Sequence, residues 1–529
     1  MNLQERSWGF VQSRNGTMTD DNSILSKHSK FLLVGIILLG VVLRMQGLTR
    51  SFWYDEVGYS TLVGFRTLFG GMWNRIWEDP AAPFYPLLMS FWVRLFGDSE
   101  LSVRMLPFLC GILSIVLIYL VALKLTDRLS AMIASFLLAL SPVHVWYSRE
   151  AVPYSMLVLL ALMSVYSFYK IKEKGRIGGW CAVYFLSLLI AVFTHWFVIV
   201  LVVVFSCLVL SEKNKRVKFL VWGLNSSIFI FPLCFLIVKS KITLVPILSG
   251  AFFLRAFTPF EGWMLFFNWF SMGNAIWPIN PYSHEQLKSL LGQPYLLFSQ
   301  FFFAYLFTKG LIAQVRETRR IDLCLYLFAL PLTLILLSLQ WPHLYIERYA
   351  LILLPFFYIA VGKGATHFKR RWLRFSAYTL LAILGAAAMD GSLSCGSKEI
   401  WSVYKPNEDW RSAVDYFDKD QSVEGDPVVV LTTASAISLR YHQEQFKKSK
   451  KKFPDLRIFR YRKGSLYSLV RRQKTKVFYL IEDVYWKMNF DALKKAADSD
   501  ARFEFLTKTT LSGLRIFKYH VKSLDMRPN

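Results

Sequence analysis

The chain has 529 residues, of which 54% are hydrophobic and 19% are charged, and its formal net charge is +26. A typical soluble domain carries about 25% charged residues, and here the apolar residues fall in blocks, so the composition excludes an ordinary soluble protein. Several blocks approach the roughly 20 helical residues that cross a bilayer. The basic residues cluster in short loops between these blocks, as in the cytoplasmic loops of membrane proteins. We therefore attribute the positive charge to membrane orientation and expect no nucleic acid as a partner.

Eleven membrane-spanning helices are expected in chain order after a cytoplasmic tail of residues 1–30. The first span, 31–48, leads into an outer loop of residues 49–101, and a second long outer loop covers 239–293. With this count every basic cluster between spans falls on the cytoplasmic side, which supports the topology. The remaining spans of this transmembrane domain, residues 31–390, are 102–123, 129–144, 155–169, 178–194, 197–210, 219–238, 294–311, 322–340, 350–362 and 375–390.

The apolar segment 84–97 lies inside the first outer loop and is too short for a comfortable span. If it crossed the membrane, all later basic loops would move to the outer side. We therefore expect an amphipathic helix that lies on the outer membrane surface.

The composition changes at residue 391, where a small extracytoplasmic α/β domain of residues 391–529 is expected. Residues 409–417 have the pattern of a helix. Short apolar runs rich in β-branched and aromatic residues predict strands, and they cover 426–433, 476–481, 503–506 and 514–519. The predicted fold class is thus a polytopic α-helical membrane protein of about eleven transmembrane helices with a small C-terminal α/β domain.

Two adjacent acids, Asp55 and Glu56, follow the first span and stand among Trp53, Tyr54 and Tyr59. Partial burial of a carboxylate at the membrane–water interface raises its pKa and makes it a better general base. A catalytic pair with Tyr59 beside it is one interpretation of this position, although the spacing alone does not favour it. The alternative is a solvated pair of loop acids.

Further acids are expected on the same side of the membrane. Glu78 and Asp79 lie in the first outer loop, and Glu150 follows the third span. Carboxylates gathered from separate loops can hold a divalent cation such as Mg²⁺ or Mn²⁺, so a metal cofactor is one interpretation. The other is that these acids pair with Arg104 or Arg149.

A third group of polar residues also emerges at the outer ends of spans. His195 stands at the turn between two spans, where a structural role is the simpler interpretation, and His343 precedes the tenth span. Arg348, beside Tyr349, suits bidentate contact with a lipid phosphate. An ion pair with Glu347 is the alternative for Arg348.

These segments, taken in order, resemble one family. They are Trp53-Tyr-Asp-Glu56, Pro83-Phe-Tyr-Pro-Leu87, Leu95-Phe-Gly97 with Glu100 and Arg104, Tyr147-Ser-Arg-Glu-Ala151 with Tyr154, Thr194-His-Trp196, Glu347-Arg-Tyr349 and Glu408-Asp-Trp-Arg411. The chain resembles the bacterial relatives of the dolichyl-phosphate-mannose protein mannosyltransferases, glycosyltransferase family 39, which have the C-type glycosyltransferase fold.

The resemblance implies a hexosyl- or pentosyltransferase that moves a sugar from a polyprenyl-phosphate-linked donor at the extracytoplasmic face. It implies Asp55 as catalytic base and Glu56 as its partner. It implies a donor-phosphate contact at Arg348, with Arg149 and Tyr349 nearby, and a metal-contacting acid at Glu78 or Asp79, with Glu150 in the second acidic segment. One displacement would invert the anomeric carbon.

The acceptor is a protein, lipid or polysaccharide hydroxyl, and the resemblance favours a bacterial inner membrane with the C-terminal domain in the periplasm or outside. Two departures from the family stand out. The usual Pro-Pro pair is spread over residues 80–83, and Val152 replaces a cation that relatives often carry.

Two other functions stay open. A scaffold that kept the fold and lost activity is favoured by Val152. A secondary transporter would need paired inverted halves with broken helices, and no such repeat is apparent.

Overall fold

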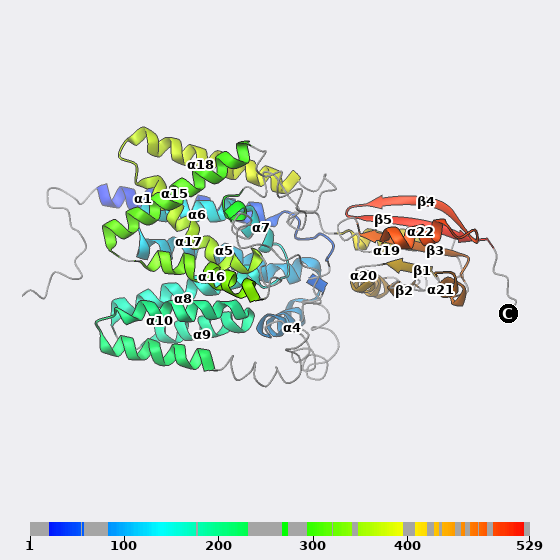
Figure 1. Cartoon of the computed structure of the whole chain (residues 1–529), viewed down its shortest axis with the longest axis horizontal. Coiled ribbons are helices and arrows are strands. Elements are labelled where there is room, and N and C mark those ends of the chain that lie inside the picture. Colours follow the sequence, from blue (N-terminus) through cyan, green and yellow to red (C-terminus); the bar gives the residue numbers. More distant parts are fainter. Residues whose placement is uncertain are drawn as a thin grey trace, which may run out of the picture.

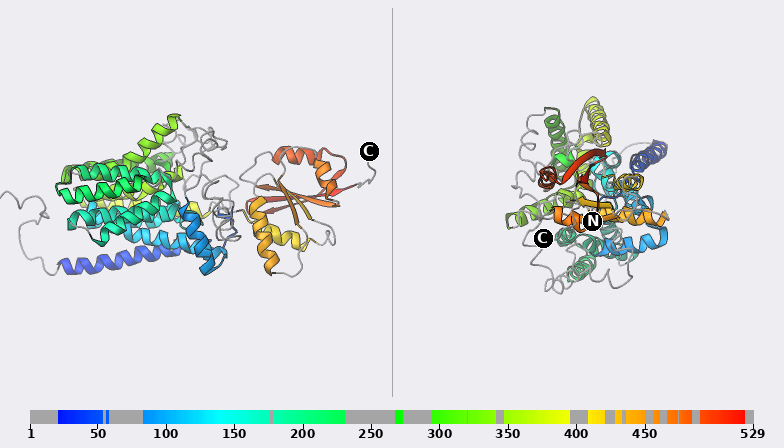
Figure 2. Two further views of the ribbon diagram at one scale, coloured as in Figure 1. Left: turned by 90° about the horizontal axis from the view of Figure 1, so that it is seen from below. Right: turned by 90° about the vertical axis from the view of Figure 1, so that its right-hand side faces the viewer.

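The structure is a computed structural model of the chain, and it combines a bundle of helices with one mixed sheet near the C-terminus (Figure 1). Figure 2 shows the long helices running side by side and the sheet beyond one end of the bundle. The residues that the structure describes are 21–53, 56–57, 83–175, 178–230, 267–272, 294–319, 321–340, 347–394, 408–420, 428–432, 436–449, 456–460, 466–473, 475–483 and 490–522.

The bundle contains helices from the first three quarters of the chain. Its long helices are α1 (Asp21–Met45), α5 (Glu100–Leu125), α6 (Arg128–Leu140), α8 (Tyr154–Lys174), α9 (Gly179–Thr194), α10 (Ile199–Leu210), α15 (Pro294–Thr318), α16 (Asp322–Gln340), α17 (Leu354–Thr366) and α18 (Arg371–Ser394). The shorter elements are α4 (Phe84–Phe96), α7 (Pro142–Tyr147), η1 (Trp196–Val198) and η3 (Glu347–Leu353). Residues 215–230 form a further helix.

Three helices in the described part of the chain are long and apolar enough to cross a membrane, namely Glu100–Leu125, Tyr154–Lys174 and Arg371–Leu393. Large apolar side chains also cover the outside of the bundle. Phe31 of α1 is 75% exposed and Phe301 of α15 is 70% exposed, which suits contact with lipid. The count of eleven spans and the side on which each loop lies stay predictions.

Residues 84–96 form helix α4, in the segment for which an amphipathic surface helix was expected. The helix buries Tyr85 and Val93 and leaves Phe91 exposed. Figure 1 places it at the end of the bundle nearest the sheet. An apolar exposed face in that position is compatible with a helix that lies on the membrane surface.

The expected span 129–144 is divided between α6 and α7. Ser141, between them, is extended because a following proline disfavours the helical conformation. Its hydroxyl accepts a hydrogen bond from the Tyr358 hydroxyl at 3.0 Å. The residues that follow α7, 148–152, are buried.

Helices α15 and α17 approach each other closely because glycines face each other. A Cβ added to Gly310 would collide with the carbonyl oxygen of Ala360, and one on Gly364 would collide with that of Leu306. Small residues at such crossings let membrane helices pack backbone to backbone.

Replacing Gly310 by alanine is therefore expected to destabilise the protein by at least about 1–3 kcal/mol, because the rigid backbone must shift. Thermal unfolding of the detergent-solubilised protein measures this. Gly223→Ala is the matched control, since nothing lies within 4 Å of a Cβ at that helical glycine. Equal melting temperatures for both variants would contradict the close packing.

The C-terminal region folds around five strands in the order β2-β1-β3-β5-β4. The first three strands in sequence are parallel to one another, and β5 is antiparallel to both β3 and β4. The strands are β1 (Val428–Thr432), β2 (Leu456–Arg460), β3 (Val477–Asp483), β4 (Phe503–Leu511) and β5 (Leu514–Val521).

Helices cover both faces of this sheet. Side chains of α19 (Trp410–Lys419) and α20 (Ala436–Ser449) pack on one face, and those of α21 (Leu466–Arg472) and α22 (Phe490–Asp498) pack on the other. Strands β1 and β3 are buried along their whole length, as expected for parallel strands between two layers of helices.

Candidate functional site

Arg104, in the first turns of α5, lies at the centre of a buried polar cluster. It is fully buried, and its guanidinium forms a two-pronged ion pair with Glu56. Its Nε donates to Glu56 Oε1 at 2.7 Å, and its Nη2 donates to Oε2 at 2.7 Å. A planar guanidinium matches a carboxylate in this geometry, which fixes both side chains.

The same guanidinium holds the backbone of the chain that follows α1. It donates to the carbonyl oxygens of Leu48 at 2.9 Å, Arg50 at 2.6 Å and Ser51 at 3.2 Å. It also lies 5.0 Å from the centroid of the Phe52 ring. Residues 48–52, here named the first-loop stretch, are thus bound to α5.

Glu56 also connects this stretch to the segment between α7 and α8. Its Oε1 accepts the backbone N–H of Ala151 at 2.9 Å, and its Oε2 accepts that of Trp53 at 3.4 Å. With both oxygens engaged and the side chain buried, Glu56 is placed to hold the loop and not to meet a substrate. Asp55, directly before it, lies outside the described residues.

Arg149 and Arg50 add positive charge beside this ion pair. Arg149 is buried, donates to the carbonyl of Gln46 at 3.0 Å and lies 5.6 Å from the Trp146 ring. Burial and the positive charge of Arg50 lower the pKa of Arg149 to about 10. Burial and the charge of Arg104 lower the pKa of Arg50. The negative charge of Glu150 acts on Arg149 in the opposite direction and raises its pKa.

Arg44 of α1 extends the positive charge into the bundle. It is fully buried and donates to the carbonyls of Gly40, Leu138 and Ala139 and to Nδ1 of His144, the last at 2.8 Å. An arginine near the end of an apolar span is costly unless it is solvated or used. This signal was available in the sequence, but neither Arg44 nor His144 was selected.

The acid Glu150 is buried beside these arginines and interacts electrostatically with Arg104 and Arg149. Among the described residues no group of three His, Cys, Asp or Glu side chains could hold a metal ion. A site built from Glu150 would therefore need acids outside that set. Glu78 and Asp79, predicted as its partners, lie outside the described residues.

The remaining predicted residues fall at the same end of the bundle or outside the described set. His195 joins α9 to η1, and its ring stacks on Phe197 with centroids 5.6 Å apart and lies 6.3 Å from the Tyr154 ring. Arg348 and Tyr349 lie in η3, which packs against α8. Tyr59 and His343 lie outside the described residues.

Comparison with known proteins places this site in a family context. A family model described as dolichyl-phosphate-mannose-protein mannosyltransferase matches residues 80–239, which include Arg104, Arg149 and Glu150. The predicted resemblance to these mannosyltransferases is confirmed.

Two curated relatives from Archaeoglobus fulgidus are dolichyl-phosphooligosaccharide-protein glycotransferases 1 and 2. Their identities to this chain are 34% over 161 residues and 30% over 167 residues, respectively. Each alignment covers 27% of this chain and 27% of the relative, so the chain matches about a quarter of their length.

Two solved structures match nearly the whole chain. ArnT from Cupriavidus metallidurans, bound to undecaprenyl phosphate, superposes with a TM-score of 0.53 at 11% identity and covers 96% of this chain and 100% of that one. The oligosaccharyltransferase AglB from Archaeoglobus fulgidus, in complex with an inhibitory peptide and a dolichol-phosphate, superposes with a TM-score of 0.52 at 13% identity. It covers 96% of this chain and 75% of that one. The chain has the C-type glycosyltransferase fold.

Proposed function

We propose that this protein transfers a sugar from a polyprenyl-phosphate-linked donor to an acceptor hydroxyl at the extracytoplasmic face of a membrane. The observation that carries the proposal is the buried Glu56–Arg104 pair, which fixes the backbone on the carboxyl side of Asp55. Arg149, which lies beside this pair, supplies positive charge that a lipid phosphate needs. The fold match to proteins solved with undecaprenyl phosphate and dolichol-phosphate supports the same donor class.

Asp55 is the general base in this proposal, and Glu56 positions it. The acceptor hydroxyl gives its proton to the Asp55 carboxylate as its oxygen forms a bond to the anomeric carbon of the sugar. The bond between that carbon and the phosphate oxygen breaks, and the electron pair leaves with the polyprenyl phosphate. A single displacement of this kind inverts the anomeric carbon.

Arg149 is assigned to the donor phosphate, together with Arg348 and Tyr349. One N–H group of its guanidinium donates a hydrogen bond to the carbonyl oxygen of Gln46. A guanidinium has five N–H donors, so others can bind a phosphate. Arg104 is less suitable, because Glu56 and four backbone carbonyls already engage it. Stabilising the phosphate as it leaves lowers the barrier more than binding the intact donor does.

Replacing Arg149 by glutamine is expected to raise the KM for the donor by roughly 10- to 100-fold, since a hydrogen bond to a charged group contributes about 1.5–3 kcal/mol. Transfer from a labelled polyprenyl-phosphate sugar in vesicles, measured over a range of donor concentrations, gives this value. Arg128→Gln is the control, because Arg128 is exposed at the start of α6. A donor KM unchanged in folded Arg149→Gln would remove this residue from the phosphate site.

A divalent cation, Mg²⁺ or Mn²⁺, would be held by Glu150 with Glu78 or Asp79 and would supply further charge at the phosphate. Carboxylate oxygens from separate segments are suitable ligands for such a cation. Its requirement is tested by removing metal with a chelator and restoring transfer with either ion. Transfer that persists after chelation would limit the phosphate contacts to the arginines and Tyr349.

The non-catalytic scaffold and the transporter make different predictions. A scaffold of this fold would transfer no sugar from any polyprenyl-phosphate donor in the presence of either cation. A transporter would exchange labelled solute across the vesicle membrane. Transfer that depends on Asp55 would exclude both.

A further inference from the structure

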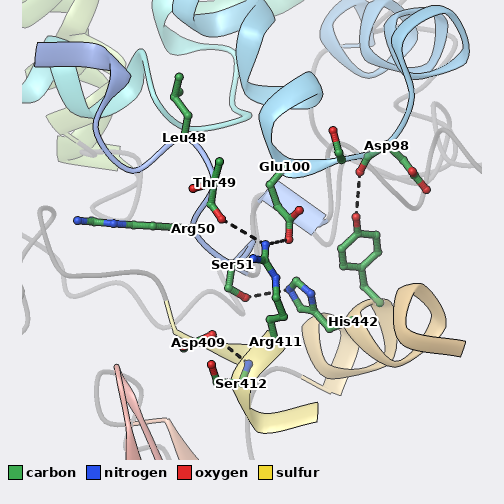
Figure 3. Close-up of polar contacts among 12 residues, drawn as sticks. Leu48, Thr49, Arg50, Ser51, Asp98, Glu100, Asp409, Arg411, Ser412 and His442 are labelled. Carbon is green, nitrogen blue, oxygen red and sulfur yellow. Dashed lines mark hydrogen bonds and ion pairs between the residues drawn. The ribbon is translucent and has the colours of Figure 1, made fainter. Parts of the chain in front are cut away.

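We propose that the C-terminal α/β region contributes to the transfer site, because Arg411 and His442 bind the same first-loop stretch that Arg104 binds. The inference rests on the function proposed above and adds two positioning residues from a distant part of the chain. Figure 3 shows the contacts between this region and residues 48–51.

Arg411, in the first turn of α19, connects the C-terminal region to the helix bundle. Its Nη2 donates to the carbonyl oxygen of Thr49 at 3.2 Å and forms an ion pair with Glu100 at the start of α5. The helix that carries it is fixed in two ways. The side chain of Asp409 caps α19 by accepting the N–H of Ser412 at 3.1 Å, and the N–H of Asp409 donates to the carbonyl of Ser512 at 2.9 Å.

His442 of α20 binds the next part of the stretch. Its Nε2 lies 3.0 Å from the hydroxyl of Ser51, and its ring also hydrogen-bonds the backbone of Phe52. The ring is buried, and this burial lowers the pKa of His442 to about 4, so the imidazole is neutral at physiological pH. A neutral imidazole offers one donor and one acceptor, which suits these two contacts.

Tyr441 and Gln445 of α20 add further contacts between the C-terminal region and the helix bundle. The Tyr441 ring lies 5.5 Å from the Phe52 ring, and its hydroxyl donates to the carbonyl of Asp98 at 3.0 Å. The amide of Gln445 donates to Asp98 Oδ2 at 2.9 Å. The buried ring of Phe52 thus contacts Arg104 of the bundle and Tyr441 of the sheet region.

Arg104 and the C-terminal region bind different atoms of the first-loop stretch. Arg104 takes the carbonyls of Leu48, Arg50 and Ser51, and the C-terminal region takes the carbonyl of Thr49 and the hydroxyl of Ser51. Loss of either set frees a backbone that lies within a few residues of Asp55. An error of about 1 Å in the position of a catalytic group can lower the rate by roughly 100-fold.

The sheet topology explains why these helices meet the bundle. Asp483 at the carboxyl end of β3 pairs with Leu514, directly after the turn whose Ser512 binds Asp409. The carboxyl edge of the parallel strands therefore lies beside the start of α19. Helix α20 follows the carboxyl end of β1 and approaches the bundle from the same edge.

The test uses the full-length protein with both contacts removed, Arg411→Gln with His442→Ala. We expect the kcat for sugar transfer to fall at least 10-fold while the donor KM changes by less than 2-fold, because Arg149, Arg348 and Tyr349, the residues assigned to the donor phosphate, lie outside the first-loop stretch. Amide hydrogen exchange in residues 46–57 should rise at least 10-fold. Arg411→Gln with His442→Gln in place of His442→Ala should recover part of the kcat, because a glutamine side chain can both donate and accept a hydrogen bond.

Arg502→Gln is the matched control, since Arg502 pairs with Asp500 on the exposed surface of the same region. It should leave the kcat and the exchange of residues 46–57 unchanged. Unchanged exchange in the double variant would overturn the positioning role, even if wild-type protein transfers no sugar and the proposed function fails. Raised exchange with an unchanged kcat would overturn the link between these contacts and catalysis.

Discussion

Asp55→Asn is expected to lower sugar transfer by about 10²- to 10⁴-fold, the usual contribution of a general base. The exchange keeps the size of the side chain but removes its ability to accept the acceptor proton. It leaves the buried Glu56–Arg104 pair intact, and that pair holds the neighbouring backbone. The variant should therefore fold and insert as the wild type does, so the loss reports chemistry and not abundance. Initial rates in vesicles at equal folded protein measure it.

Asp500→Asn is the control for this change, because Asp500 lies on the C-terminal region and pairs only with Arg502 in the described structure. It should transfer sugar at the wild-type rate. An Asp55→Asn variant that retains the wild-type rate would contradict the assignment of Asp55 as the general base.

Arg104→Met is expected to destabilise the protein by about 3–5 kcal/mol, the cost of leaving one partner of a buried ion pair without the other. Glu56 would stay buried without the guanidinium that forms its ion pair. The carbonyls of Leu48, Arg50 and Ser51 would lose their donor as well. The melting temperature of the detergent-solubilised protein should fall well below that of Arg128→Met, which alters an exposed arginine.

Combining Arg104→Met with Glu56→Met separates stability from positioning. Replacing a whole buried pair by apolar residues often restores stability, so the double variant should melt above the single one. Sugar transfer should stay low, because the first-loop stretch no longer has its anchor. A double variant with full transfer would show that the pair is not needed to position the loop.

The membrane character of the chain and much of its secondary structure could be predicted from local patterns. Apolar runs gave the expected positions of strands, and β1, β3, β4 and β5 lie there. Strand β2 (Leu456–Arg460) was not predicted, because it is short and carries an arginine at two of its five positions. The division of one expected span at Pro142 was also not predicted, although proline supplies the physical reason.

The candidate site was predictable only where its residues are neighbours in sequence. Asp55 and Glu56 stood out as an adjacent pair of acids, but Glu56 and Arg104 are 48 residues apart and no periodicity connects them. From the sequence alone, Arg104 was considered as an ion-pair partner for other acids, and in the structure it forms its ion pair with Glu56. Arg411 and Thr49 are 362 residues apart. Such pairs depend on how helices and sheet pack, and one sequence carries no direct signal of that packing.

The most direct test of the central proposal is sugar transfer by wild-type protein in vesicles, using a panel of labelled donors. The panel contains polyprenyl-phosphate sugars of several prenyl lengths, and nucleotide sugars serve as the comparison. We predict that product forms from at least one polyprenyl-phosphate donor, with release of polyprenyl phosphate, and not from nucleotide sugars alone. Transfer from nucleotide sugars in the absence of the lipid donors, or no transfer from any polyprenyl-phosphate sugar, would contradict it.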